Sequence, residues 1–201
     1  NKNYNELKKN LLGGYNLTCL GYSKVYGCIL SKYENNLSDK YLLQAYKNLK
    51  INYKIFSFLD RGSDERQFNS PKVNLPITTI FRSKFNNFRQ YHTSLDNFDI
   101  VSNDIIESSF NLVKKTIIIF QNQIIPIAKY TCEPNMGKRG LYSLISKKNN
   151  KKFYNTKNLM NFLQYADGKN DINDIAKRIK LSSKETIKNY NLLKQKKLLE
   201  V

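Results

Sequence analysis

The chain has 201 residues, with 34 lysines and arginines against 16 aspartates and glutamates, so its net charge at pH 7 is +18. Hydrophobic residues make up 40% of the sequence, which is enough to build a core and excludes a disordered tail. No apolar run is long enough to cross a bilayer, and no basic leader precedes an apolar stretch. We therefore expect neither a membrane protein nor a secretion signal.

The positive charge has two possible explanations. Lysine and arginine bind the phosphates of nucleic acids, which favours a nucleic-acid partner. However, the lysines are spread along the chain, and the abundant Lys, Asn, Ile and Tyr all have A/T-rich codons, so genome composition alone could produce the charge. The charge by itself therefore does not decide between nucleic-acid binding and genome composition.

The three cysteines, Cys19, Cys28 and Cys132, are odd in number, widely spaced and without a C-x-x-C pair. This pattern argues against a disulfide framework or a zinc knuckle. Small buried thiols in a reducing compartment fit better, and we expect a cytoplasmic protein.

The first part of the chain alternates predicted strands and helices. Strands are expected at "GGYNLTCLG" (13–21), "YGCILS" (26–31), "INYKIFSFL" (51–59) and "LPITTIFRS" (75–83). The almost unbroken apolar run at 51–59 predicts a strand covered on both faces.

Two helices are predicted, one between these strands and one after the last of them. The first follows Ser38, a predicted N-cap, and the second follows Ser102. In the second helix, the predicted buried side carries Ile106, Phe110, Val113 and Ile117. The alternation predicts an α/β fold in which helices cover a sheet.

The pattern changes after the polar stretch "SKKNNKK" (146–152), which we interpret as a linker between an α/β domain (1–145) and a small domain (153–201). Three short helices are predicted beyond it, the last opened by a capping box of Ser182 and Glu185. "KLLEV" (197–201) could form the first strand of a wing. The small domain is therefore predicted to be a winged helix-turn-helix.

The outer side of the third predicted helix carries polar and basic residues, namely Lys184, Lys188, Asn191 and Gln195. A DNA-binding winged helix places its base and phosphate contacts there. Basic, solvent-facing helices are also ordinary, however, so a packing or protein-interaction module is the favoured alternative.

Two loops after predicted strands carry candidate functional groups. "RGSDERQF" (61–68) supplies carboxylates, and "YHTSLD" (91–96) holds His92, which is the one histidine of the chain. In an open sheet, such loops border a crevice, where a carboxylate and an imidazole could converge on a metal ion. A solvated, salt-bridged loop and a histidine in a tight turn remain the alternative.

The motifs "GSDERQF", "LPITTIF" and "YHTSLDNFD" together resemble the zinc-dependent exopeptidases of the leucyl aminopeptidase and glutamate carboxypeptidase type. With "CEPNMGKRGLY" and "MNFLQYADGKNDINDIA", the chain is more similar to a bacterial branch of aminopeptidase-like proteins with a C-terminal winged helix. Members of that branch often accompany surface-polysaccharide genes. The resemblance implies part of a three-layer mixed-sheet domain.

The resemblance also implies roles for individual residues. Asp64 matches the carboxylate that binds one zinc ion, and His92 matches the imidazole that binds the other. Two zinc ions in a complete site activate a water molecule for attack on a peptide or amide bond. Arg82 and Tyr91 are weaker candidates for lining the substrate site, with structural packing as their alternative.

The chain departs from that family by what it lacks. The family's first histidine ligand, the aspartate that bridges both metals and a glutamate pair that includes the general base all lie upstream of the matched part. Asp64 and His92 would be the only ligands, one for each metal, whereas zinc normally takes about four. The implied partner is a missing N-terminal part of the same protein. That part would supply the general base, which is expected upstream of Asn1.

Three hypotheses follow. The chain is the C-terminal portion of a zinc-dependent aminopeptidase-like hydrolase, or a non-enzymatic winged-helix protein that binds nucleic acid or protein, or an inactive remnant of the enzyme. We favour the first hypothesis as the evolutionary origin of the chain. The sequence does not decide whether this chain alone is active, what its substrate is or whether it forms oligomers.

Overall fold

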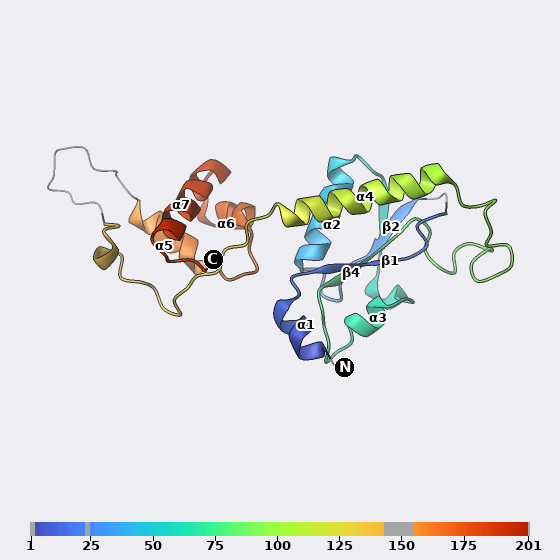
Figure 1. The fold of residues 1–201 in the computed structure, drawn as a ribbon, viewed down its shortest axis with the longest axis horizontal. Helices are drawn as coiled ribbons and strands as arrows, with labels where there is room; N and C mark the ends of the chain where they lie inside the picture. The colour runs from blue at the N-terminus through green and yellow to red at the C-terminus, as the bar shows by residue number, and fades with distance from the viewer. Residues whose placement is uncertain (1–2, 23–24, 143–154, 201) are drawn as a thin grey trace. The chain divides into compact units, whose positions relative to one another are not determined.

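The computed structural model describes residues 3–22, 25–142 and 155–200 (Figure 1). These residues form two compact units, which divide between Asn122 and Gln123. A mixed sheet with helices makes up the first unit, and three short helices dominate the second. Within the described ranges, no helix is long and apolar enough to cross a membrane.

The first unit is built on a four-stranded sheet. Its elements are α1 (Tyr4–Asn10), β1 (Gly14–Leu17), β2 (Tyr26–Ile29), α2 (Leu37–Asn48), β3 (Tyr53–Phe56), α3 (Glu65–Phe68), β4 (Ile77–Phe81) and α4 (Asn103–Gln121). The strand order is β1-β4-β2-β3. β1 is parallel to β4 and β2 is parallel to β3, whereas β4 runs antiparallel to β2. The predicted α/β class with a mixed sheet is confirmed.

The two faces of the sheet are covered differently, as the central strand β4 shows. Ile80 packs into a core with residues of α2 and α4 on one face. Its neighbour Phe81 points to the opposite face, where it packs with Ile29 and Phe85. α3 and the loops around it cover this second face, because α3 contacts β4 there. The sheet thus separates the layer of α2 and α4 from a layer that contains the short helices α1 and α3 with their loops (Figure 1).

The N-cap of α2 lies two residues before the predicted one. Asn36 is the cap, and it forms a capping box with Asp39. Ser38 lies inside the first turn, where its Oγ accepts a hydrogen bond from the Gly14 amide at 2.8 Å and donates one to the Pro76 carbonyl at 2.9 Å. The prediction placed the helix correctly but missed that Ser38 joins it to β1 and the start of β4.

The predicted strand at 51–59 is shorter and more exposed than expected. Only Tyr53–Phe56 is strand, and β3 lies at the edge of the sheet. Ile55 is 45% exposed, and Leu59, in a 3-10 turn after the strand, is 82% exposed. The prediction of a strand covered on both faces was wrong. An apolar run indicates that a strand is present, but it does not indicate whether that strand lies in the middle or at the edge of its sheet.

The predicted buried side of α4 was also wrong, although its N-cap, Ser102, is confirmed. The residues that α4 buries are Ser109, Leu112, Thr116 and Ile119. Of the four residues expected in the core, Ile106, Phe110 and Ile117 are exposed, and only Val113 packs against it. Apolar residues occupy more than one side of this helix, so helical periodicity fitted two different faces equally well.

The second unit contains α5 (Thr156–Gln164), α6 (Ile172–Ile179) and α7 (Ser183–Gln195). A short turn joins α6 to α7, with Lys180 in the left-handed region at φ 56°. The predicted capping box of Ser182 and Glu185 opens α7. All three helices predicted for this region are therefore confirmed.

The boundary between the units lies earlier than residue 145. Residues 123–142 pack with the three helices, because Met136 and Leu141 are buried in one core with Leu159 and Phe162. Backbone pairing also anchors this segment: Ala128 bridges Leu199 in an antiparallel arrangement. The predicted linker at 146–152 lies outside the described residues.

The same pairing places the predicted wing strand. Leu199 belongs to "KLLEV", and its partner Ala128 precedes α5 rather than following α7. The amide of Lys129 donates to the Leu198 carbonyl at 3.0 Å, and the amide of Glu200 donates to the Ile127 carbonyl at 2.9 Å. Residues 198–200 therefore pair as part of an antiparallel arrangement, but with a segment that the sequence-based boundary assigned to the other domain.

Candidate functional site

An open pocket of about 500 Å³ lies in the first unit. Three segments form its wall: the residues that follow β1, the turn before α3, and the long loop between β4 and α4. The predicted ligands Asp64 and His92 both line it, and so does Tyr91. Folding therefore brings together two side chains that lie 28 residues apart in the sequence.

A buried carboxylate holds the turn that carries Asp64. Glu65 is 1% exposed, and its Oε1 accepts hydrogen bonds from the amides of Gly62 at 2.7 Å and Ser63 at 3.0 Å. Its Oε2 accepts from Thr79 Oγ1 in β4 and Asn16 Nδ2 in β1, both at 2.9 Å. Because Glu65 joins the turn to two strands, it fixes the backbone of the residue beside it, Asp64.

These hydrogen bonds also set the charge of Glu65. Burial alone raises the pKa of a carboxyl group, but the hydrogen bonds from the Ser63 and Gly62 amides and from the Thr79 hydroxyl outweigh burial here. The pKa of Glu65 therefore lies below its ordinary value. The sequence contained no signal that set Glu65 apart from the other charged residues of "RGSDERQF".

Two contacts join the Asp64 turn to the loop that carries His92. The Phe85 ring lies so close to Gly62 that a Cβ atom there would approach the ring to 2.2 Å. Lys84 Nζ lies 3.3 Å from Asp60 Oδ1. Phe85 is buried against Phe81 of β4, so the contact between the two loops is supported by the sheet. The two loops thus have a common support, although they follow different strands.

His92 lies at the surface of the pocket. Its side chain is exposed, and its backbone is left-handed, with φ 57°. The imidazole stacks on the Tyr91 ring, with 4.0 Å between ring centroids and 13° between planes. Tyr91 in turn meets the edge of Phe88 at 5.6 Å. An aromatic stack therefore supports one face of the His92 ring, which lies exposed at the pocket.

Cys19 and Asp96 are among the other titratable residues that line the pocket, and the sequence analysis assigned neither to a site. Burial, with a smaller contribution from the nearby Asp96 carboxylate, raises the pKa of the Cys19 thiol. A raised pKa keeps the thiol protonated at neutral pH, and a protonated thiol is a poor nucleophile.

Arg82 does not line the pocket. Its guanidinium lies over the Tyr26 ring, 4.4 Å from the ring centroid, and donates to the Ile105 carbonyl at 3.3 Å. It also contacts the Ser108 hydroxyl. Arg82 therefore joins the end of β4 to α4. It has the packing role that was the alternative to lining the substrate site. Tyr91 is the one of the two weaker candidates that the structure places at the site.

The donors in the pocket fit zinc in kind but not in number. Carboxylate and imidazole are both zinc ligands, and a complete site takes about four. Across residues 3–22, 25–142 and 155–200, no group of three or more His, Cys, Asp or Glu side chains is arranged to hold a metal ion. The described residues therefore supply two zinc-type donors in this pocket, and we derive no catalytic step from them.

The general base was expected upstream of Asn1, and that expectation stays a prediction. Asn1 itself lies outside the described residues, which begin at Asn3. Glu65 is the buried carboxylate nearest to Asp64 in the sequence, but both of its oxygens already accept hydrogen bonds from the turn and the sheet. We therefore do not assign Glu65 to the missing role.

The fold and the pocket define a class of protein: a mixed α/β unit with a loop-lined crevice, followed by a winged helix-turn-helix. Residues 124–201 match the winged helix-turn-helix model, which agrees with the boundary between the units. Residues 1–123 match DUF4910, described as a domain of unknown function. The chain belongs to this family.

Two relatives carry more informative names. A protein of Clostridium acetobutylicum, named as a candidate polysaccharide biosynthesis protein with an aminopeptidase-like domain, is 32% identical over 169 residues, which are 84% of this chain and 38% of that protein. A crystal structure of a candidate peptidase from the same organism matches with a TM-score of 0.60 and 28% identity, covering 99% of this chain and 44% of that one. The chain thus spans less than half the length of either relative.

Proposed function

We propose that this chain forms one side of a zinc-dependent, aminopeptidase-like hydrolase site that acts on a peptide or amide bond. The observation that carries the proposal is that Asp64 and His92, on loops after different strands, line one pocket. The names of the two relatives, aminopeptidase-like and peptidase, support the same class of activity. The remaining ligands and the general base would come from the part of the protein that the longer relatives possess.

The roles of the chain's own residues follow from their positions. Asp64 and His92 would each contribute one ligand, with Glu65 as a positioning residue for the Asp64 turn. Tyr91 would orient His92, because the two rings stack. Arg66 also lines the pocket, where its guanidinium can bind a carboxylate or carbonyl oxygen of a substrate.

Zinc content and hydrolysis test the proposal in the protein made from the complete coding sequence that contains this chain. Asp64→Asn and His92→Gln should each lower the bound zinc and the hydrolysis of a panel of aminoacyl p-nitroanilides by at least about tenfold. Asp99→Asn is a matched control, because Asp99 is exposed on the same loop as His92 and does not line the pocket. Full zinc content and full hydrolysis in both pocket variants would overturn the proposal.

A second candidate function, nucleic-acid binding, is favoured by the outer side of α7. Lys184, Lys188, Asn191 and Gln195 are all exposed there, at the positions that the sequence predicted. Binding to phosphates through these lysines would weaken as salt rises, with a slope of about −0.9 in log–log units for each phosphate contacted. An affinity for duplex DNA that Lys184→Ala and Lys188→Ala leave unchanged, at any salt concentration, would exclude this function for α7.

A further inference from the structure

The pocket has an aromatic wall. Tyr22 and Phe88 stack with 4.5 Å between ring centroids and 15° between planes. Phe88 and Tyr91 meet edge to face at 5.6 Å, and Tyr91 stacks on His92. All four residues line the pocket. We call Tyr22, Phe88 and Tyr91 the aromatic wall, and its contacts continue to the predicted zinc ligand His92.

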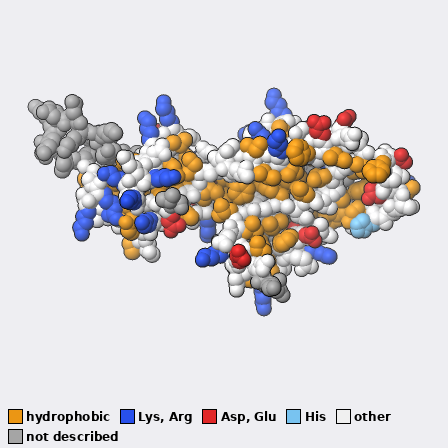
Figure 2. Space-filling view, viewed as in Figure 1, with side chains coloured by type: hydrophobic (Ala, Val, Ile, Leu, Met, Phe, Trp, Pro, Cys, Tyr) orange, Lys and Arg blue, Asp and Glu red, His pale blue; other side chains and the backbone are white. Residues whose placement is uncertain are grey.

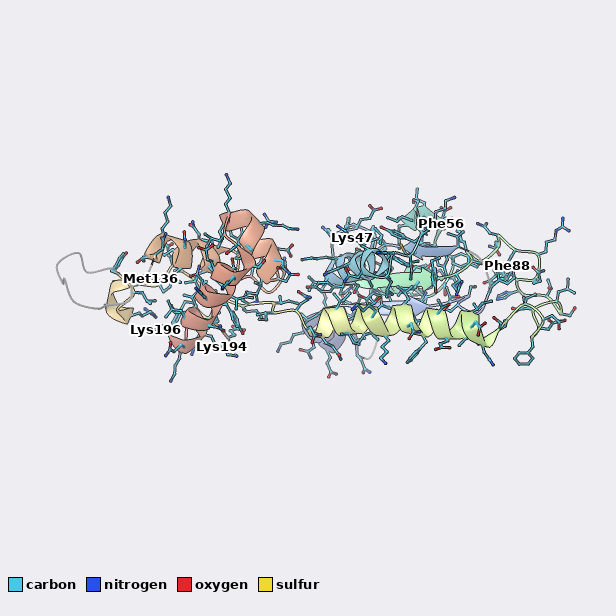
Figure 3. The ribbon with its side chains drawn as sticks, turned by 90° about the horizontal axis from the view of Figure 1, so that it is seen from above. Lys47, Phe56, Phe88, Met136, Lys194 and Lys196 are labelled. Atoms are coloured by element: carbon cyan, nitrogen blue, oxygen red, sulfur yellow. The ribbon has the colours of Figure 1, made fainter. Side chains whose placement is uncertain are left out.

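Two segments that are far apart in the sequence build this wall. Tyr22 lies shortly after β1, where its backbone bridges Val101, the residue before the N-cap of α4. Phe88 and Tyr91 come from the long loop between β4 and α4. Figure 3 shows Phe88 at the end of the first unit where α4 begins. Tyr91 also contacts Phe85, which is buried against the sheet, so the wall is a supported part of the pocket.

The aromatic wall is partly exposed. Tyr22, Phe88 and Tyr91 are each half-buried and line the pocket, so part of their surface is open to a ligand. Figure 2 shows the one histidine of the chain at the surface of the first unit, beside hydrophobic side chains. A ligand that contacts the wall therefore also lies close to His92.

Polar side chains surround the wall. Besides Asp64, the pocket is lined by an exposed carboxylate, an exposed guanidinium and two hydroxyls, which belong to Asp96, Arg66, Thr18 and Ser63. Pockets that enclose an apolar group are lined mostly by apolar side chains and have few polar ones. A purely apolar group here would remove water from charged side chains without replacing their hydrogen bonds, which costs free energy.

A sugar ring carries both kinds of surface that match this lining. Its C–H groups form apolar faces, and their hydrogens are attracted to the negative face of an aromatic ring. Its hydroxyls lie around the rim and can both donate and accept hydrogen bonds. The Asp96 carboxylate accepts such bonds, and the Arg66 guanidinium donates them. The aromatic wall and the polar lining together therefore fit a saccharide better than an apolar amino-acid side chain.

We propose that the pocket binds a saccharide ring against the aromatic wall, and that the substrate is an N-acylated amino sugar. The second part rests on the proposed hydrolase function. An amide on a ring that contacts Phe88 and Tyr91 lies toward His92, because the contacts of the wall lead there. Hydrolysis adds one water molecule: the carbonyl carbon gains its oxygen and the C–N bond breaks. The acyl group leaves as a carboxylate, and the sugar nitrogen takes up both protons to become an ammonium group.

A ligand-observed NMR titration tests both parts, using the protein made from the complete coding sequence. The probes are the methyl glycosides of N-acetylglucosamine, N-acetylgalactosamine and N-acetylmannosamine, whose free acetate appears in the same spectra if the amide is cut. Phe88→Leu keeps an apolar side chain but removes the ring, whereas Phe88→Tyr keeps the ring. Phe98→Leu is the matched control, because Phe98 is 93% exposed on the same loop and does not line the pocket.

We expect the wild type to bind at least one glycoside and release acetate from it. Phe88→Leu should weaken binding by about three- to tenfold, which is the usual effect of losing one aromatic contact. Phe88→Tyr and Phe98→Leu should bind as the wild type does, and zinc content should be equal in all four proteins. No binding of any of the three glycosides, or equal binding by Phe88→Leu, would overturn the saccharide site. Binding without acetate release would overturn the substrate assignment.

The outcomes separate this inference from the proposed function. Zinc content and the hydrolysis of aminoacyl p-nitroanilides are measured on the same protein. Bound zinc and p-nitroanilide hydrolysis without glycoside binding would support the hydrolase and contradict the saccharide site. Glycoside binding that depends on the Phe88 ring, with no zinc and no hydrolysis of any amide, would do the opposite.

Discussion

Glu65 and Thr79 form a hydrogen bond of 2.9 Å that joins the turn before α3 to the central strand of the sheet. Glu65 uses its other oxygen to accept from the amides of that turn. The position of Asp64, the predicted zinc ligand, thus depends on a buried neighbour whose partners are all uncharged.

Replacing Glu65 should destabilise the first unit. Glu65→Ala leaves the amides of Gly62 and Ser63 and the hydroxyl of Thr79 without their acceptor, which should cost about 1–3 kcal/mol of unfolding free energy in urea. Glu107→Gln is the matched control, because Glu107 is exposed on α4. An unchanged unfolding free energy in Glu65→Ala would contradict the assigned role.

The pH dependence of stability should report on the same residue. The pKa of Glu65 is lowered in the folded protein, so its contribution is complete above the unfolded pKa of about 4.3 and is lost as pH falls through the lower folded value. Urea unfolding between about pH 6 and pH 3 should show a smaller loss of stability in Glu65→Gln than in the wild type. Parallel pH profiles for the two proteins would argue against this pKa shift.

Gly62 should not tolerate a side chain. A Cβ atom there would lie 2.2 Å from the Phe85 ring, so Gly62→Ala must displace the turn or the ring, at a cost of about 1–3 kcal/mol. Phe85→Leu removes ring atoms and should recover part of that loss in the double variant, which thermal unfolding of all four proteins would measure. If the losses of the two single variants simply add, the contact does not have the importance assigned to it.

Two of the cysteines, Cys132 and Cys28, should differ strongly in reactivity. Cys132 is exposed, whereas burial, with help from Asp39, raises the pKa of Cys28 to about 12. At pH 8 only about one Cys28 thiol in ten thousand would be ionised even if reagent reached it. Iodoacetamide labelling followed by mass spectrometry should find Cys132 modified first and Cys28 unmodified until the protein is denatured. Equal labelling of both in the folded protein would be inconsistent with this structure.

The second unit should fold only with the segment that precedes α5. A fragment covering 123–201 keeps Met136 and Leu141 in the core with the three helices. A fragment covering 153–201 loses both, and burial of such side chains contributes about 1.5–3 kcal/mol each. Circular dichroism should show a cooperative thermal transition for the first fragment and none for the second. A cooperative transition in the shorter fragment would restore the boundary near residue 150.

The sequence by itself determined the class of fold and the main elements, and its resemblance to a known family supplied the candidate ligands Asp64 and His92. Short-range signals were sufficient for the elements: Ser182 and Glu185, for example, form a capping box within one turn. Local hydrogen bonds and helical or strand periodicity depend on neighbours a few residues away, and those neighbours are visible in the sequence.

Only the tertiary structure decided which apolar surfaces are buried and which side chains meet. Phe110 and Leu112 are both apolar and lie on one helix, yet only Leu112 is buried, because α2 and the sheet cover one side of α4. Arg82 and Tyr91 were equal candidates, and the fold directed Arg82 to α4 and Tyr91 to the pocket. Burial and convergence depend on contacts between residues far apart in the chain, and sequence periodicity carries no information about those contacts.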